Sequence, residues 1–279
     1  MRIRCWGARG SIPVSGPEYL KYGGDTTCIE IRTQEDEIII IDAGSGIRKL
    51  GNQLLTEKRY QYHMIFTHAH WDHILGFPFF KPIYMRKTFI QMYGCPFTQE
   101  SIRNMISRVM TSPNFPVDFE NIQAKISYRE ACRSQFSIKS MTIVPIYASH
   151  PNSGIGYKFL EDGKSFVFLT DNELAFKHPG GLAFADYVQF AREADLLLHD
   201  AEFSLEEYKT RRTWGHSAYP DALRLALEAR VKKFGLFHHN QDRPDAAVDE
   251  IVQECRRIIA DHHSPLECFA AHAGFEMQL

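Results

Sequence analysis

Four potential metal ligands stand together directly after an apolar stretch typical of a strand. Residues 67–73 read Thr-His-Ala-His-Trp-Asp-His. In extended backbone the alternating His68 and His70 lie on one face, whereas Asp72 and His73 need a turn to reach the same point. Imidazole and carboxylate groups crowded in this way are the ligand set of zinc, manganese or iron. The motif predicts a fold in which a strand ends at a metal site. The competing interpretation is a solvated, histidine-rich loop.

Further candidate ligands follow other apolar runs. Four residues can hold one metal ion well but not two, and additional ligands should also lie at strand ends. His150, Asp171 and His238 each stand just beyond an apolar run. The alternatives are a surface histidine at 150 and a simple turn residue at 171. His239 competes with its neighbour for the last position, and the strand pattern before them favours His238.

The order of the predicted elements indicates a layered α/β domain. Strand candidates are 2–6, 26–32, 37–41, 62–67, 121–128, 136–140, 143–147, 156–160, 165–170, 194–199 and 233–238, and helix candidates are 99–110, 182–193, 220–229 and 244–259. The first 70 residues read as strands joined by turns. We expect one domain over residues 1–279, with residues from about 74 to 140 as a cover over the mouth of the site rather than a second domain.

Composition limits the partners and the compartment. A formal net charge of −2 and the absence of a long basic run argue against nucleic-acid binding, although a small phosphodiester stays compatible. No stretch approaches the ~20 apolar residues of a membrane span, and we see no signal peptide. The cysteines are irregularly spaced and read as isolated thiols of a reducing compartment. The cytoplasm is the expected location, and a homodimer is the default assembly.

The motif and the order of its partners resemble the metallo-β-lactamase superfamily. This resemblance implies an αββα sandwich of four layers, with the site along the sheet edges. It implies two divalent metal ions per chain, with zinc fitting best on ligand type and manganese second. Carried over residue by residue, the first site is His68, His70, His150 and Asp171, and the second is Asp72, His73, Asp171 and His238.

A second element points to one branch of that superfamily. Residues 214–218 read Trp-Gly-His-Ser-Ala, which resembles the Gly-His-Ser/Thr element of the ribonuclease Z and cyclic phosphodiesterase branch. The resemblance implies that His216 protonates the leaving group and that Asp200 pairs with it. The competing interpretation is a loop histidine packed on its neighbouring Trp214. Asp72 could in addition act as a base, and Asp42 either supports a ligand histidine or is purely structural.

These features predict a metal-dependent phosphodiesterase that acts on a small or cyclic phosphodiester, for instance a cyclic nucleotide, through a hydroxide activated by two metal ions. The aromatic residues at 77–80 and Tyr84 could line a pocket for a base or a sugar. The first alternative is an endonuclease of the transfer-RNA 3′-end type, against which stands the lack of a basic, Gly/Pro-rich arm. The others are a thioester hydrolase and a metal-bearing binding module without catalytic activity.

Overall fold

Two seven-stranded sheets form the centre of the molecule. The computed structural model describes residues 1–94, 102–130 and 134–279. In order across the first sheet run β14 (Glu276–Gln278), β1 (Arg2–Gly7), β2 (Cys28–Arg32), β3 (Ile38–Ile41), β4 (Gln61–Ile65), β5 (Phe89–Gly94) and β6 (Lys125–Glu130). Across the second run β13 (Glu267–Ala270), β12 (Lys233–Phe237), β11 (Leu196–Asp200), β10 (Lys164–Leu169), β9 (Gly154–Glu161), β8 (Met141–Ala148) and β7 (Phe136–Ile138).

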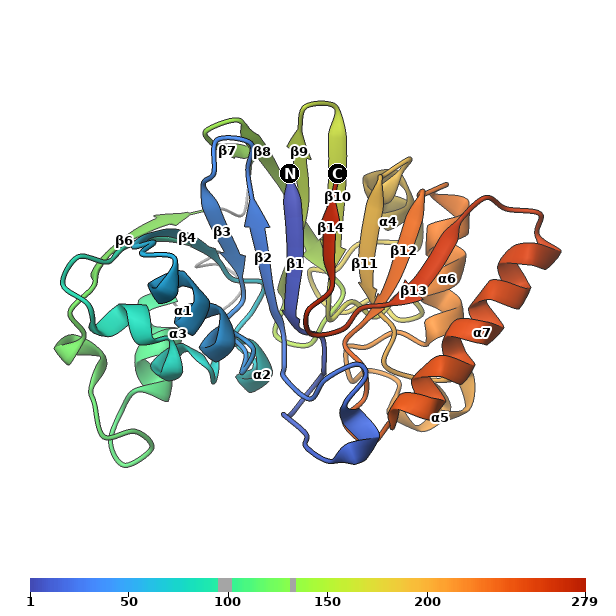
Figure 1. Ribbon diagram of the computed structural model, residues 1–279. Helices are drawn as coiled ribbons and strands as arrows, with labels where there is room; N and C mark the ends of the chain where they lie inside the picture. The colour runs from blue at the N-terminus through green and yellow to red at the C-terminus, as the bar shows by residue number, and fades with distance from the viewer. Residues whose placement is uncertain (95–101, 131–133) are drawn as a thin grey trace.

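Helices cover the outer face of each sheet, which gives four layers (Figure 1). The first sheet carries α1 (Ile47–Thr56), α2 (Trp71–Ile74), the 3-10 turns η2 (Phe77–Phe79) and η3 (Lys81–Tyr84), and α3 (Ile102–Val109). The second carries α4 (Phe184–Ala191), α6 (Tyr219–Glu228) and α7 (Asp245–Asp261), with α5 (Leu205–Arg211) nearby. The remaining turns are η1 (Pro17–Tyr19) and η4 (Phe119–Asn121). The predicted αββα sandwich is therefore confirmed. No described helix is long and apolar enough to cross a membrane.

The apolar runs are buried on both faces because their strands lie inside the sandwich. In β3, Ile39 and Ile41 pack into the core between the sheets, while Ile38 and Ile40 pack against the helices outside. Strand β10 divides its side chains in the same way between the two neighbouring layers. A strand places successive side chains on opposite faces, so such a run fills two cores at once.

The site lies where parallel strands end. Strands β3 to β6 are parallel to one another, and so are β10 to β13. The carboxyl ends of parallel strands meet at one sheet edge, where α/β folds commonly place their ligands. The two sheets bring these edges together, so that residues far apart in sequence face one another.

Several elements differ from the sequence-based prediction. The first 70 residues contain α1, whose Ile47, Leu50 and Leu54 recur at helical spacing and are buried. The predicted strand 121–128 is shifted, because η4 ends at Asn121 and β6 runs from Lys125. Strands β5, β13 and β14 and helix α5 had no prediction. Residues 99–101 of the predicted helix 99–110 lie outside the described residues, and α3 covers most of the remainder.

Four of the cysteines are described, and each is a buried free thiol; they are Cys5, Cys28, Cys255 and Cys268. Cys95 and Cys132 lie outside the described residues.

Candidate active site

Sharp backbone turns just after three strands direct the side chains of Asp42, Asp171 and His238 toward one cluster. Asp42 follows β3, Asp171 follows β10 and His238 follows β12, with φ angles of 60°, 49° and 57°. Positive φ is uncommon for residues other than glycine, costs about 1–2 kcal/mol, and gathers at functional positions. These three turns lie at the edge where the two sheets face each other.

The turn that the sequence motif requires is the short helix α2. His68 and His70 follow β4, and the backbone N–H of His73 then donates to the carbonyl of His70 at 3.0 Å. This single helical turn carries Asp72 and His73 back toward the two earlier histidines. The rings of His68 and His73 lie 4.1 Å apart, centre to centre.

The first group of converging side chains comes from three segments of the chain. The Nε2 atom of His150 lies 3.0 Å from Nδ1 of His70 and 4.0 Å from Oδ2 of Asp171. The Nε2 atom of His68 lies 3.4 Å from the same oxygen. These four residues, as predicted for the first site, offer nitrogen and oxygen atoms within 4.8 Å of one another.

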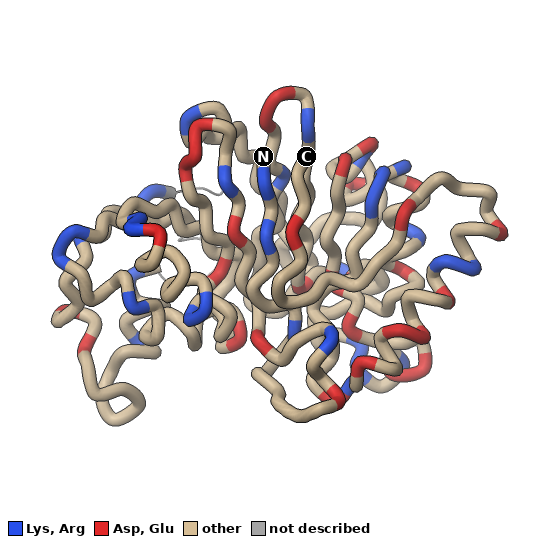
Figure 2. Tube along the Cα trace, in the orientation of Figure 1, with Lys and Arg blue, Asp and Glu red and all other residues tan. Residues whose placement is uncertain are grey.

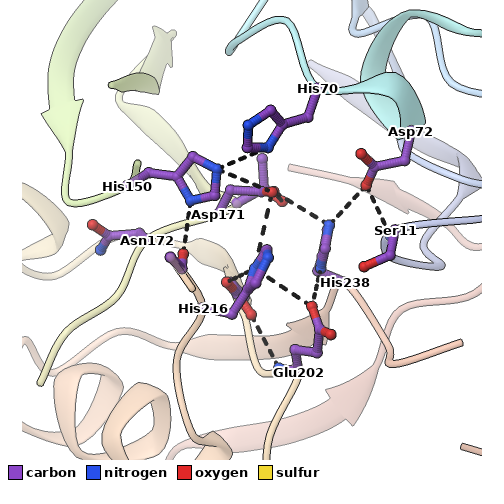
Figure 3. Close-up of polar contacts among 12 residues, drawn as sticks. Ser11, His70, Asp72, His150, Asp171, Asn172, Glu202, His216 and His238 are labelled. Atoms are coloured by element: carbon purple, nitrogen blue, oxygen red, sulfur yellow. Dashed lines mark hydrogen bonds and ion pairs between the residues drawn. The ribbon is translucent and has the colours of Figure 1, made fainter. Parts of the chain in front are cut away.

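The second group shares Asp171 with the first (Figure 3). The Oδ1 atom of Asp171 lies 3.2 Å from Nε2 of His73 and 3.4 Å from Nε2 of His238. The Oδ2 atom of Asp72 lies 3.0 Å from Nε2 of His238 and also accepts the backbone N–H of Ser11 at 2.9 Å. Asp171 thus presents one oxygen to each group, as a bridging ligand does.

The outer hydrogen bonds leave the inner imidazole nitrogens suited to a metal. A carbonyl only accepts, so Nδ1 of His150 donates to the carbonyl of Gly215 at 2.9 Å. By the same reasoning Nδ1 of His73 donates to Asp42 at 2.7 Å, and Nδ1 of His238 donates to Glu202 at 3.0 Å. In neutral imidazole the other nitrogen then carries a lone pair. Such outer partners are typical of metal-binding histidines.

Unsatisfied buried atoms indicate what the cluster lacks. The Nε2 atoms of His68 and His73 are buried and have no hydrogen-bond partner. Buried polar atoms are nearly always paired, and lone-pair nitrogens facing carboxylates have their natural partner in a divalent cation. The donor set of histidine nitrogen and aspartate oxygen therefore fits zinc or manganese.

The charges lead to the same conclusion. Burial lowers the pKa of His68 and His70, and lowers that of His150 to about 3, which keeps these rings neutral. Burial also acts on His73 and His238, but the neighbouring carboxylates outweigh it and raise the pKa of both. The acidic groups at the centre thus require nearby positive charge, from protons or from metal ions.

His216 stands at the rim of the two groups. Its Nδ1 atom lies 2.9 Å from Oδ2 of Asp200 and 3.4 Å from Oε2 of Glu202, and its ring stacks on that of His238 at 4.7 Å. Burial lowers its pKa, but Glu202 and Asp200 outweigh this effect and raise the pKa to about 9. The structure therefore places Asp200 against His216, and the two carboxylates favour the protonated form of this imidazole.

Trp214 does not explain the position of His216. The Trp214 side chain is largely exposed, whereas Phe203 forms an edge contact with the His216 ring at 5.9 Å. The loop is held instead by Glu173, a buried carboxylate that accepts the backbone N–H groups of Thr213 and Gly215, both at 2.8 Å.

Two acidic residues of the site had no sequence-based prediction. Glu202 contacts both His216 and His238, and its other oxygen accepts from Asn240. The sequence feature that could have indicated Glu202 is its position two residues beyond Asp200, just after strand β11 ends. Glu173 has no comparable motif in the sequence, because its partners in the His216 loop lie 40 and 42 residues away.

The two neighbouring histidines 238 and 239 point in opposite directions. The Nε2 atom of His239 donates to the carbonyl of Ala271 at 2.8 Å, away from the cluster, while His238 faces Asp72. The left-handed turn at His238, just after β12 ends, separates the two adjacent side chains. The structure thus places His238 in the second group and His239 outside it.

A cavity of about 400 Å³ opens over these groups. It is lined by Ser11, Ala69, His70, Trp71, Asp72, Asp171, His216 and His238. Residues of both groups therefore share one solvent-accessible space with the imidazole of His216. This arrangement can bind a small anionic ester, activate water and protonate a leaving group.

Known proteins share this architecture over the whole chain. Ribonuclease Z of Haloarcula marismortui is 23% identical, over 92% of this chain and 91% of its own length. Ribonuclease Z of Haloferax volcanii is 21% identical, over 100% and 95%. A diphosphatase from the PhnP family superposes with a TM-score of 0.72 at 17% identity, covering 100% of this chain and 97% of its own. The short form of human tRNase Z gives 0.68 at 18%, covering 100% and 99%.

A family model settles the wider relationship. The model described as the beta-lactamase superfamily domain matches residues 37–239. This match spans most of the chain, from β3 through the last residues of the site, and it includes the complete His-x-His-x-Asp-His motif. The two-sheet sandwich, the ligand groups at its edge and this match agree, and the chain belongs to the beta-lactamase superfamily, with the metallo-β-lactamase fold.

Proposed function

We propose that this protein is a metal-dependent phosphodiesterase that acts on a small or cyclic phosphodiester. The observation that carries the proposal is the position of His216: an imidazole hydrogen-bonded to Asp200 borders the same cavity as both groups of converging ligands. Hydrolysis of a phosphodiester needs a nucleophile on one side of phosphorus and a proton for the alkoxide that leaves on the other. This site offers groups for both.

The proposed ligands are the seven residues of the two groups: His68, His70, Asp72, His73, His150, Asp171 and His238. Two divalent ions held there, zinc by preference or manganese, would supply Lewis acidity toward the phosphoryl oxygens and a water molecule of lowered pKa.

We assign the two proton transfers of the reaction to Asp72 and His216. Asp72 borders the cavity and could accept a proton from the attacking water. Its other contacts, the Ser11 N–H and His238, hold its carboxylate in place. Because Asp200 occupies Nδ1 of His216, the free Nε2 nitrogen can donate its proton to the leaving oxygen. General acid catalysis of this kind contributes about 10²–10⁴-fold in rate.

Charge and cavity size support a small substrate. Figure 2 shows positions of Lys and Arg interspersed with positions of Asp and Glu along the chain trace, and the net charge is −2. Long nucleic acids are bound mainly through dense positive charge. A cyclic nucleotide or cyclic phosphate matches a compact cavity and needs no such surface.

A second candidate is an endonuclease of the transfer-RNA 3′-end type. It is favoured by the similarity to proteins named ribonuclease Z over more than nine-tenths of the chain. The same groups would serve both reactions. Cleavage of a precursor transfer RNA with a 3′ trailer, at rates above those on a cyclic nucleotide, would favour this candidate over the first.

The proposal also includes the domain organisation of the chain and the segment that covers the site. We propose a single domain over residues 1–279, in which α3 and the residues that follow it cover one side of the site. Strands β5 and β6 belong to the first sheet, so any cover is formed by the segments between and before them. A homodimer in the cytoplasm remains the expected setting.

The decisive test is turnover of bis(p-nitrophenyl) phosphate by protein stripped of metal and then loaded with zinc or manganese. We expect metal-dependent hydrolysis that Asp171→Ala abolishes, because this residue joins the two groups. The matched control is Asp162→Ala, an exposed aspartate in the β9–β10 turn, which should leave turnover unchanged. No turnover by wild-type protein with two metal ions bound would overturn the proposal and direct attention to thioesters and to binding without catalysis.

A further inference from the structure

A second cavity lies beside the candidate active site. It measures about 560 Å³ and is lined by Ala69, Trp71, Ile74, Leu75, Pro78, Phe79, Met105, Arg108, Val109, Asn114 and Phe115. Ala69 and Trp71 also line the cavity over the ligand groups. Because both flank His70, a molecule whose phosphoryl group lies at that cluster can extend directly into this second space.

The second cavity exposes aromatic rings that a folded protein ordinarily buries. Trp71 is 77% exposed and Phe79 is 52% exposed. The rings of Phe115 and Phe79 meet edge to face, with centres 5.6 Å apart and planes at 85°. Because the two rings are not stacked in parallel, Phe115 does not cover both faces of Phe79. Large apolar side chains exposed together in a concavity are a mark of ligand binding.

The neighbouring aromatic residues have a different role from the one their sequence suggested. Phe77 and Phe80 are fully buried among the helices of the first sheet. Tyr84 turns its hydroxyl to the carbonyl of Pro78 at 2.7 Å. Of the aromatic residues predicted to line a pocket, Phe79 alone lines this cavity, beside Pro78 and aromatic side chains that the sequence pattern did not single out.

The opposite wall is mostly apolar, with Arg108 of α3 as its charged side chain. Met105 and Val109 face the cavity from α3, which packs beside η2 on the helical side of the first sheet (Figure 1). Residues 109–117, which follow as Val-Met-Thr-Ser-Pro-Asn-Phe-Pro-Val, contain no charged side chain. Apart from Arg108, this wall therefore offers an apolar surface to a neutral ring.

We propose that this cavity, which we call the ring subsite, binds an aromatic ring carried by one ester group of the substrate. The inference rests on the proposed function and narrows it to aryl or nucleobase-bearing phosphodiesters. A planar ring can stack on the exposed faces of Phe79 and Trp71, with its edge toward the apolar wall from α3. Asn114 offers an amide to the polar edge of a base.

The test measures binding rather than turnover, so that it does not depend on catalysis. Zinc-loaded protein is titrated calorimetrically with three phosphonates that share the phosphoryl group: methylphosphonate, n-hexylphosphonate and phenylphosphonate. We expect phenylphosphonate to bind about tenfold more tightly than methylphosphonate and more tightly than the hexyl compound, since stacking favours a flat ring over a flexible chain.

Two variants locate the effect. Phe79→Ala removes a half-exposed ring that is remote from the ligand residues, and should weaken phenylphosphonate about fivefold to tenfold while leaving methylphosphonate unchanged. Phe89→Ala removes a similarly exposed ring on β5, outside both cavities, and should change neither. Phe115→Ala provides a second test on the same wall.

Each outcome decides between the two proposals. Equal affinity for the phenyl and methyl compounds, or an equal loss for both in Phe79→Ala, would overturn the ring subsite. A tighter n-hexyl compound would overturn it in favour of an aliphatic chain. Aryl-selective binding without hydrolysis of bis(p-nitrophenyl) phosphate would retain the ring subsite and reject the phosphodiesterase function. Failure of every phosphonate to bind would reject the placement of the phosphoryl group, and the ring subsite with it.

Discussion

Replacing Asp42 by asparagine tests whether the outer hydrogen bonds prepare the histidines for metal. Asp42 is buried and accepts from the N–H of Thr67 at 2.8 Å, from its hydroxyl at 2.7 Å and from Nδ1 of His73 at 2.7 Å. Burial raises the pKa of this carboxyl, and the three donors oppose that change. Asparagine has nearly the same shape and tolerates the positive φ of this position.

The expected effect follows from donor and acceptor counting. The amide oxygen of the new side chain can still accept from Thr67, but its NH₂ group would face Nδ1 of His73. His73 must then carry its proton on Nε2, directed at the site. Loss of such an outer partner lowers metal affinity about 10–100-fold, equivalent to about 1.4–2.7 kcal/mol.

Stability without metal should change much less. In the metal-free protein a proton on Nε2 of His73 faces Asp171 at 3.2 Å and Asp72 at 3.3 Å, and these contacts do not involve Asp42. The substitution therefore costs only the hydrogen bond at Nδ1, and we expect the free energy of unfolding to fall by about 1 kcal/mol. The predicted signature is a large loss of affinity with a small loss of stability.

The assay combines zinc competition against a chromophoric chelator with urea unfolding of the metal-free protein. Asp162→Asn is the matched control, since Asp162 also has positive φ, at 50°, but is exposed in a turn. Zinc affinity of Asp42→Asn within twofold of wild type would refute the reasoning, because the tautomer of His73 would then not depend on Asp42.

Two further predictions concern the proton donor and a remote carboxylate. His216→Ala should lower kcat at least 100-fold with zinc content by elemental analysis unchanged; lost zinc would mark a structural role instead. Asp195 accepts from Ser165 and Lys232, both at 2.8 Å, and these outweigh burial to lower its pKa. A carboxyl group whose pKa is lower in the folded state than its unfolded value of ~3.9 stabilises the folded state above that pH. This stabilisation is lost as the pH falls from the unfolded pKa through the folded pKa. Asp195→Asn should therefore lower the free energy of unfolding by about 1 kcal/mol at pH 7, and urea titrations should show this difference closing as the pH falls through the lowered pKa of folded Asp195; a constant difference would contradict this.

The strongly patterned elements of the fold were predictable from the chain. The four isoleucines of β3 and the apolar run of β10 could only be strands buried on both faces, and α7 showed its apolar stripe directly. Helix α1 was missed because polar residues and Gly51 interrupt its apolar positions, which recur only at helical spacing. Strand β14 was missed because three half-exposed residues carry almost no pattern, and its pairing with β1 alone defines it.

Residues within one local segment could also be assigned to the site without coordinates. The spacing of His68, His70, Asp72 and His73 already required a turn after a strand, and the apolar runs before His150 and Asp171 marked further strand ends. Local sequence carries this information because backbone periodicity decides which side chains share a face.

What the sequence alone determined was therefore the set of ligand-type residues and their place at strand ends. Tertiary structure decided which of them meet: the choice of His238 over His239, the position of Asp171 in both groups, and the support given by Glu202 and Glu173. It also decided that Phe79 lines a cavity while Phe77 and Phe80 fill the core. The reason is physical. Periodicity acts over a few residues, whereas these contacts depend on how two sheets pack, which brings together side chains more than a hundred residues apart.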